Sequence, residues 1–182
     1  MPSFQRNHVA PVDLPTIGLL DGPAERVFDQ VTQAICLAMD VPVSLLSIID
    51  PDRERQFFKS ATGLCEPWAS KRETPLSHSF CQYVVTTGNP LIVIDARENE
   101  LVSCNAAIRD LSVIAYAGVP VSGPDEQPIG ALCAIASEPR PWTAPEIAVL
   151  SCLGDGLSSE IRLRAAMLAG AELVDRALPL AS

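Results

Sequence analysis

Two side chains that can do chemistry, His78 and Cys81, stand three residues apart in the run Thr74-Pro-Leu-Ser-His-Ser-Phe-Cys81. An apolar-periodic stretch begins here, and its pattern predicts a helix over about residues 75–87 with both side chains on one face. Such a pair fits four roles: a thiol nucleophile with its base, half of a metal site, a covalent attachment point, or plain packing. The other histidine of the chain, His8, lies in the N-terminal lead.

A catalytic thiol needs a lowered pKa, which a helix N-terminus or a cationic neighbour can supply. In the predicted helix, Cys81 lies about two turns from the start, where the helix dipole acts weakly. A histidine base also needs an orienting partner, and the sequence near His78 holds no obvious one. In the packing alternative, the apolar residues from Phe80 to Val85 form a buried face, and His78 caps or lines the start of the helix.

The six cysteines are scattered along the chain without the close pairs of a zinc site. They are Cys36, Cys65, Cys81, Cys104, Cys133 and Cys152. In a reducing compartment, isolated thiols of this kind serve as small buried side chains, and we expect that role for most of them. One histidine in the folded body and no close acidic cluster also argue against heme and other metals, so we expect no metal site.

The chain is acidic, because 13 Lys and Arg stand against 22 Asp and Glu, which gives a formal net charge of -9. Nucleic acids and anionic membranes attract basic proteins, so we expect neither as a partner. The N-terminus lacks the apolar segment of a signal peptide, and the longest apolar runs, such as residues 41–49, are far shorter than a membrane span. These features predict a cytoplasmic protein.

A length of 182 residues with 48% hydrophobic residues favours one domain with short extensions. Apolar periodicity predicts helices over residues 23–40, 75–87 and 106–110. A long final helix is predicted to follow the capping box Thr143-Ala-Pro-Glu146. Runs of β-branched residues predict strands over residues 43–49, 56–60, 91–94, 113–120 and 129–136. Because several strands follow one another as hairpins, the pattern favours an α+β fold with a mostly antiparallel sheet.

Several segments together carry a resemblance to a known family. They are Gly18-Leu-Leu-Asp21, Arg55-Gln-Phe-Phe-Lys-Ser60, the run that ends in Cys81, Pro90-Leu-Ile-Val-Ile-Asp-Ala96, Ala115-Tyr-Ala-Gly-Val-Pro120 and Ile129-Gly-Ala-Leu-Cys133. In this order and spacing, residues 17–162 resemble a GAF domain, a sensory module found in bacterial sensor kinases, diguanylate cyclases and stress-response phosphatases. Residues 1–16 are then a lead segment, and residues 163–182 are a C-terminal helix extension and tail.

The resemblance implies a PAS-like layout: a central antiparallel sheet of five or six strands, the terminal helices on one face and a ligand-type pocket on the other. In that layout, the residues expected to face the pocket are Phe80, Cys81, Asp95, Asn105, Ile108, Arg109, Tyr116 and Cys133. Asp95 is expected either to cap a loop or to anchor a ligand, and Arg109 is the nearby cation. The sequence identifies no cofactor.

This chain departs from the common GAF pattern at two places. No kinase, cyclase or phosphatase sequence follows the long helix, so we expect a stand-alone module. The fifth strand ends in Ile135-Ala-Ser137, whereas an Ile-Asp pair is common at this position in the family.

The resemblance implies a sensory or regulatory domain of signal transduction that binds a small ligand or a partner protein without catalysis of its own. We expect a homodimer through the terminal helices, and a separate signalling protein that reads a shift of those helices. One alternative is a thiol-dependent enzyme similar to free methionine-R-sulfoxide reductase, or a redox sensor that uses Cys81 with His78. A purely structural dimerisation module is a third reading. Bilin attachment is disfavoured, because Gln82 follows Cys81 where bilin-binding domains carry His.

Overall fold

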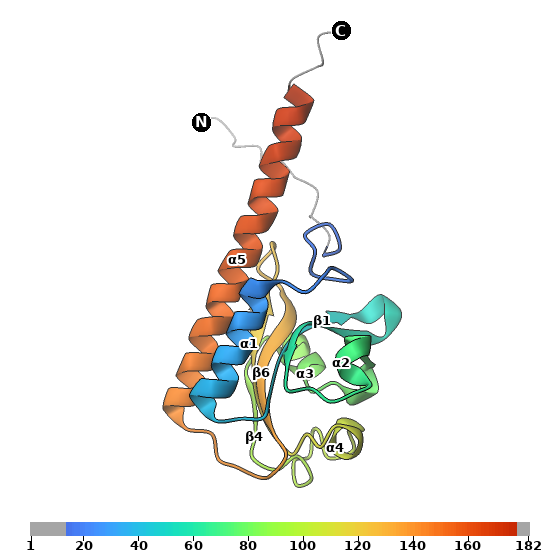
Figure 1. Cartoon of the computed structure of the whole chain (residues 1–182), viewed down its shortest axis with the longest axis vertical. Coiled ribbons are helices and arrows are strands. Elements are labelled where there is room, and N and C mark those ends of the chain that lie inside the picture. Colours follow the sequence, from blue (N-terminus) through green and yellow to red (C-terminus); the bar gives the residue numbers. More distant parts are fainter. Residues whose placement is uncertain (1–13, 178–182) are drawn as a thin grey trace, which may run out of the picture.

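A six-stranded antiparallel sheet forms the centre of the computed structural model, which describes residues 14–177 (Figure 1). The strands lie in the order β3-β2-β1-β6-β5-β4. Their bounds are β1 (Val43–Asp50), β2 (Arg55–Thr62), β3 (Glu73–Pro75), β4 (Leu91–Val93), β5 (Ala115–Ser122) and β6 (Pro128–Ala136). The predicted α+β class with an antiparallel sheet is therefore confirmed. Most of the predicted lead segment and the last residues of the predicted tail lie outside the described residues.

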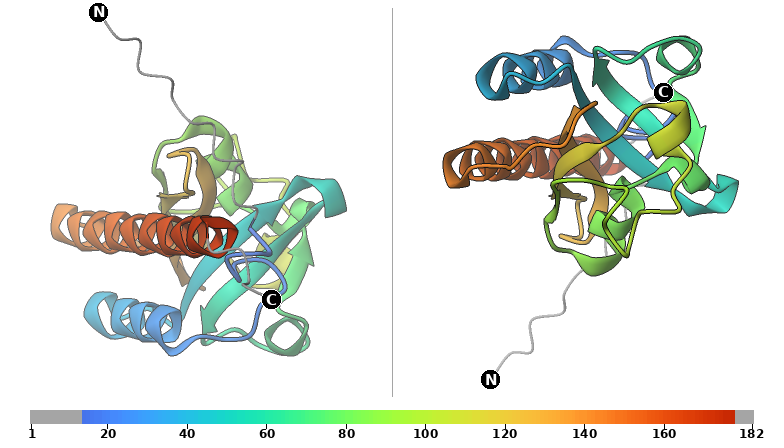
Figure 2. Two further views of the ribbon diagram at one scale, coloured as in Figure 1. Left: turned by 90° about the horizontal axis from the view of Figure 1, so that it is seen from above. Right: turned by 90° about the horizontal axis from the view of Figure 1, so that it is seen from below.

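The two terminal helices, α1 (Arg26–Met39) and α5 (Ala144–Ala177), cover one face of the sheet side by side (Figure 2). Apolar residues at helical spacing turn inward from both helices and meet the inward residues of the central strands. The core on this face includes Phe28, Ile35, Leu46, Ile48, Ala117, Val119, Leu132, Leu150, Leu157 and Ile161. This layer holds α5 against the middle of the sheet.

The opposite face carries α3 (Cys81–Thr87) and the short helices α2 (Trp68–Lys71) and α4 (Ala107–Asp110). A second core lies between α3 and strands β1, β5 and β6. Its buried members include Leu45, Phe58, Phe80, Cys81, Val84, Tyr116, Ala131 and Cys133. Strand alternation places these strand residues on the face away from α1 and α5.

The predicted continuous helix over residues 75–87 is wrong, because the chain forms two separate elements there. The 3-10 turn η2 (Leu76–His78) ends at Ser79, which is extended, and α3 begins at Cys81. The buried Ser79 hydroxyl donates to Gln56 Oε1 at 2.7 Å and accepts the Gln82 backbone N–H at 3.0 Å. This side chain breaks the helix and restarts it, so Cys81 is the first residue of α3 and does not lie two turns inside a helix.

The long helix α5 begins at the predicted capping box. The Thr143 hydroxyl donates to Glu146 Oε2 at 2.8 Å, and the same carboxylate oxygen accepts the Thr143 backbone N–H at 2.7 Å. The helix spans 34 residues and extends well beyond the sheet (Figure 1). Between residues 14 and 177, no helix is both long and apolar enough to cross a bilayer.

Candidate functional site

A small cavity lies beneath the first turn of α3, on the face of the sheet opposite α1 and α5. Its volume is about 30 Å³, and its walls include Phe80, Cys81, Tyr116 and His78. A wider hollow of about 290 Å³ adjoins it and shares Leu64 and several other apolar walls with it. The inner cavity is thus a narrow space, while the outer hollow opens beside Trp68 and Asp110.

Cys81 and Tyr116 are among the polar residues that line the inner cavity, with Gln56 and His78. The Tyr116 hydroxyl donates a hydrogen bond to Cys81 Sγ over 3.3 Å, and the Phe80 and Tyr116 ring centroids lie 5.4 Å apart. Hydrogen bonding with the Cys133 thiol lowers the pKa of Cys81, and Tyr116 adds to this effect against the opposing effect of burial. Burial raises the pKa of Cys133. The two neighbouring thiols are therefore unequal.

His78 does not pair with Cys81, although both side chains line the cavity. Its Nε2 donates to Asp110 Oδ2 at 3.0 Å, Ser77 Oγ lies 3.0 Å from its Nδ1, and its ring packs at 5.5 Å from that of Trp68. Asp110 is thus the orienting partner that the sequence near His78 does not reveal. The predicted helical face shared by His78 and Cys81 does not exist, because the chain turns at Ser79 between them.

Hydrogen bonds from Arg109 and His78 lower the pKa of Asp110 to about 2. Arg109, which we expected at the pocket, is an exposed partner of this carboxylate. It lines neither the inner cavity nor the outer hollow.

Four further residues expected at the pocket also line neither of these two spaces: Asp95, Asn105, Ile108 and Cys133. The Asp95 carboxylate accepts hydrogen bonds from the Arg97 backbone and side chain, which is the loop-capping role. Asn105 Oδ1 accepts the Ala107 N–H at 3.0 Å at the start of α4. Ile108 and Cys133 pack in the second core.

Potential metal ligands do not gather in the part of the chain that the structure describes. Within residues 14–177, no group of three or more His, Cys, Asp or Glu side chains is placed to hold a metal ion. All six cysteines carry free thiols, and Cys65, Cys104 and Cys152 are exposed.

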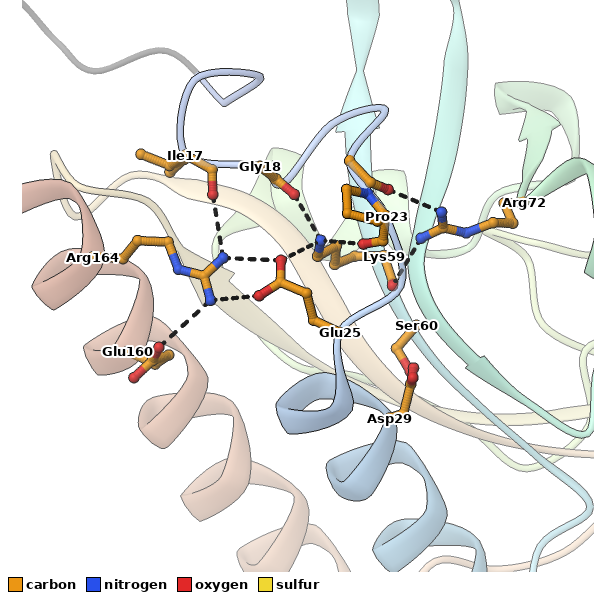
Figure 3. Close-up of polar contacts among 11 residues, drawn as sticks. Ile17, Gly18, Pro23, Glu25, Asp29, Lys59, Ser60, Arg72, Glu160 and Arg164 are labelled. Atoms are coloured by element: carbon orange, nitrogen blue, oxygen red, sulfur yellow. Dashed lines mark hydrogen bonds and ion pairs between the residues drawn. The ribbon is translucent and has the colours of Figure 1, made fainter. Parts of the chain in front are cut away.

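A second polar cluster, absent from the sequence analysis, joins the terminal elements on the helix-covered face (Figure 3). Its centre is the fully buried ammonium group of Lys59 on β2. The Nζ atom donates to the carbonyl oxygens of Gly18 and Pro23 at 2.7 and 2.8 Å, and it forms an ion pair of 2.6 Å with Glu25. These contacts hold the segment before α1 against the sheet.

Arg164 connects α5 to the same cluster (Figure 3). Its guanidinium donates to both carboxylate oxygens of Glu25, at 3.0 and 2.8 Å, and to the Ile17 carbonyl at 3.3 Å. Burial raises the pKa of Glu25, but the hydrogen bonds from Arg164 and Lys59 outweigh it, so that pKa is lowered. Glu25 therefore links α5, β2 and the N-terminal segment through one carboxylate.

Comparison with known proteins gives the family and the fold. The model of the GAF domain family matches residues 23–161. A cyclic di-GMP phosphodiesterase of Pseudomonas aeruginosa is 32% identical over 156 residues, which cover 82% of this chain and 24% of the relative. The chain thus spans about a quarter of that relative's length.

The same fold recurs in solved structures at low sequence identity, as two examples show. The GAF domain of a phosphoenolpyruvate-protein phosphotransferase from Coxiella burnetii is 19% identical with a TM-score of 0.65, covering 82% of this chain and 89% of that one. The free methionine-R-sulfoxide reductase from Neisseria meningitidis is 16% identical with a TM-score of 0.61, covering 85% and 89%. Similarity at this level of identity shows the fold alone. The match to the GAF family model spans most of the chain and therefore shows the family. The chain belongs to the GAF domain family.

Proposed function

We propose that this chain is a regulatory GAF module of signal transduction, which passes a change in its body to a signalling partner through α5. The observation that carries the proposal is the continuity of α5. Its inner half is buried on the sheet through Leu150 and Ile161, and its outer half presents Leu163, Met167 and Leu173 to solvent. A rigid helix of this kind can convey a shift at the sheet to whatever binds its outer half.

The charged cluster at Glu25 supports this role for α5. Arg164 lies where the helix leaves the body, and its partner Glu25 also neutralises the buried Lys59. A displacement of α5 at Arg164 therefore disturbs a buried charge, which is costly. This cost favours discrete positions of α5 over a gradual shift, as a two-state signalling element requires.

The size of the cavity restricts the input to this module. A water molecule needs about 10–15 Å³ of such space, so the inner cavity of about 30 Å³ holds about two. Organic ligand sites begin near 300 Å³. We therefore propose that a small organic ligand or a segment of a partner protein binds in the outer hollow, beside Trp68 and Asp110.

Catalysis by Cys81 is a weaker proposal for the same reason. An enzyme acting on methionine sulfoxide needs a thiol that the substrate can reach. Cys81 is 3% exposed, Cys133 is 0% exposed, and the space beside Cys81 is too small for an amino acid. We propose a module without catalysis of its own.

The relative of Pseudomonas aeruginosa suggests the kind of output, because it acts on a cyclic dinucleotide messenger. We propose that this chain regulates an enzyme of cyclic di-GMP turnover. The partner on the outer half of α5 is a second copy of the chain, because its apolar residues recur on one helical face.

A chimera tests this regulatory role. The segment of the phosphodiesterase that aligns with this chain is replaced by this chain, and the hydrolysis of cyclic di-GMP is measured. We expect an active chimera whose rate changes about fivefold or more on Leu163→Lys, since regulatory couplings reach this size. The matched control is Leu101→Lys, at a residue of similar exposure on a loop away from the terminal helices. Equal rates for the two variants would contradict the proposal.

A further inference from the structure

Cys81, Tyr116 and Cys133 meet in the second core beneath the first turn of α3. Gly118 has no side chain, and the Tyr116 hydroxyl occupies the space above it: an added Cβ would lie 2.1 Å from that oxygen. Cys133 is the direct cross-strand partner of Gly118, so its side chain starts about 5 Å away on the same face. The same hydroxyl is 3.3 Å from Cys81 Sγ. The register of β5 and β6 thus places Cys133 beside the hydroxyl that contacts Cys81, and each thiol shifts the pKa of the other.

The surroundings of the two thiols favour chemistry at Cys81. Tyr116 donates to its sulfur, which stabilises a thiolate. Ser47 helps to lower the pKa of Cys81 from a longer distance; within residues 14–177 its hydroxyl has no hydrogen-bond partner of normal geometry. Cys133 is fully buried, and its pKa is raised. Cys81 is therefore suited to attack an oxidant as a thiolate. Cys133 is suited to a second step, in which it attacks the oxidised Cys81.

The inner cavity gives a small oxidant access to Cys81. Cys81 lines this cavity and Cys133 does not. A volume of about 30 Å³ accommodates the two oxygen atoms of hydrogen peroxide and excludes larger organic substrates. His78 and Leu64, which also line it, are partly exposed, and the wider hollow adjoins it there.

We propose that Cys81 and Cys133 form a reversible disulfide when hydrogen peroxide enters this cavity. The Cys81 thiolate attacks a peroxide oxygen: an S–O bond forms, the O–O bond breaks, and the leaving oxygen takes the thiol proton to give water. Cys81 is thereby oxidised by two electrons to a sulfenic acid. Cys133 sulfur then attacks Cys81 sulfur, the S–O bond breaks, and hydroxide leaves as water with the Cys133 proton.

The disulfide joins α3 to the central strand β6. The two sulfurs of a disulfide lie about 2.05 Å apart, so bond formation draws the start of α3 toward the sheet. The neighbours of Cys133 along β6, Leu132 and Ala134, face the core under α1 and α5. The idea that this disulfide shifts α5 rests on the proposed function. The formation of the disulfide does not depend on that function.

The test uses the full chain with four cysteines replaced: Cys65→Ser, Cys104→Ser and Cys152→Ser at exposed sites, and Cys36→Ala at a half-buried one. Circular dichroism first establishes that the variant is folded. After hydrogen peroxide and a denaturing quench, we expect the intact mass to fall by two hydrogens, peptide mapping to link Cys81 with Cys133, and dithiothreitol to reverse both. Thiols that remain fully alkylatable after peroxide would overturn the proposal.

Two further variants separate the roles of the residues. With Cys133→Ser, dimedone added with the denaturing quench should trap a sulfenic acid on Cys81, because the second thiol is missing and unfolding exposes the oxidised sulfur to the reagent. Tyr116→Phe keeps the ring and removes the hydrogen bond to sulfur, and we expect oxidation about tenfold slower, the effect of losing one hydrogen bond to a charged group. An unchanged oxidation rate in Tyr116→Phe, or no trapped Cys81, counts against the mechanism.

Hydrogen exchange of α5 distinguishes the two proposals. Exchange in residues 162–173 that changes on oxidation supports the disulfide as an input to the helix. A disulfide that forms while this exchange stays constant leaves the thiol chemistry standing and contradicts its link to the proposed function.

Discussion

At the scale of single residues, the most consequential group is the ammonium of Lys59, which is fully buried. A buried charge is tolerated only when it is paired and hydrogen-bonded, and Glu25 with the carbonyls of Gly18 and Pro23 meets that need. Removal of one member of a buried ion pair leaves the other charge uncompensated, and this lowers stability more than removal of both members. Glu25 is therefore a stability determinant as well as a link to α5.

We expect Glu25→Gln to lower the free energy of unfolding by about 3 kcal/mol, the usual cost of breaking a buried ion pair from one side. Guanidinium titration followed by circular dichroism measures the change. The control is Glu160→Gln, which removes the other acidic partner of Arg164 at 3.6 Å on the surface. Because Glu160 is 40% exposed and its contact with Arg164 is long, this pair should contribute less than about 0.5 kcal/mol. Similar losses in both variants would contradict the central role of Glu25.

The pH dependence of stability gives a second readout of the same substitution. The pKa of Glu25 is lowered in the folded protein, so its contribution is present above the ordinary glutamate pKa of about 4.3 and is lost as pH falls through the folded value. The native chain should lose stability steeply below about pH 4. The Gln variant should show a shallower loss over the same range.

Strand alternation and apolar spacing predict which face each residue of the candidate site takes, as for Phe80, Tyr116 and Cys133. They do not predict contacts that depend on register, such as the Tyr116 hydroxyl above Gly118 and beside Cys81. The break in the helix between His78 and Cys81 could have been predicted from the sequence. Ser79 and Gln82 stand at the spacing of a capping box, which marks the start of a new helix. The cluster around Lys59 had none, because its partners come from distant segments.

At the scale of elements, α5 packs closely on β5 through a small residue. An added Cβ at Gly154 would lie 2.8 Å from a Val119 methyl group, whereas one at Gly156 meets nothing within 4 Å. Both glycines lie inside the same helix, so alanine gains about 1 kcal/mol of helix propensity at each. At Gly154, overpacking of about 2 kcal/mol exceeds that gain.

We therefore expect Gly156→Ala to raise the free energy of unfolding by about 1 kcal/mol and Gly154→Ala to lower it by about 1 kcal/mol. Chemical denaturation of both variants measures the difference. If Gly154→Ala is as stable as Gly156→Ala, α5 does not approach the sheet as closely as the structure has it.

Helices and strands with strong periodicity were predictable, and α1, β1, β5, β6 and the capped start of α5 follow the predicted ranges closely. Elements of three or four residues offer too few positions to show a period. The short elements β4 and α4 still fall in the predicted ranges 91–94 and 106–110, whereas α2 and β3 match no predicted element. They depend on tertiary pairing, as in the hydrogen bonds that join the edge strand β3 to β2.

At the scale of the whole molecule, an acidic chain presents an apolar helix. The formal net charge is -9, yet Leu163, Met167 and Leu173 on the outer half of α5 are 58%, 68% and 59% exposed. With Gly170 between them, they recur at spacings of three and four, which forms one stripe. Two copies can bury this stripe against each other around a two-fold axis.

We expect a homodimer that Leu163→Lys weakens about a hundredfold, because two-fold symmetry removes two buried leucines at once, each contributing about 1.5 kcal/mol. Sedimentation equilibrium measures the dissociation constant, and Leu101→Lys on the loop before α4 is the matched control. Because both copies are acidic, added salt screens their repulsion and should strengthen an apolar dimer. If salt weakens the dimer, or if Leu101→Lys disrupts it as much as Leu163→Lys does, the dimer forms through another surface. If the chain stays monomeric at high concentration, a second copy is not the partner of α5.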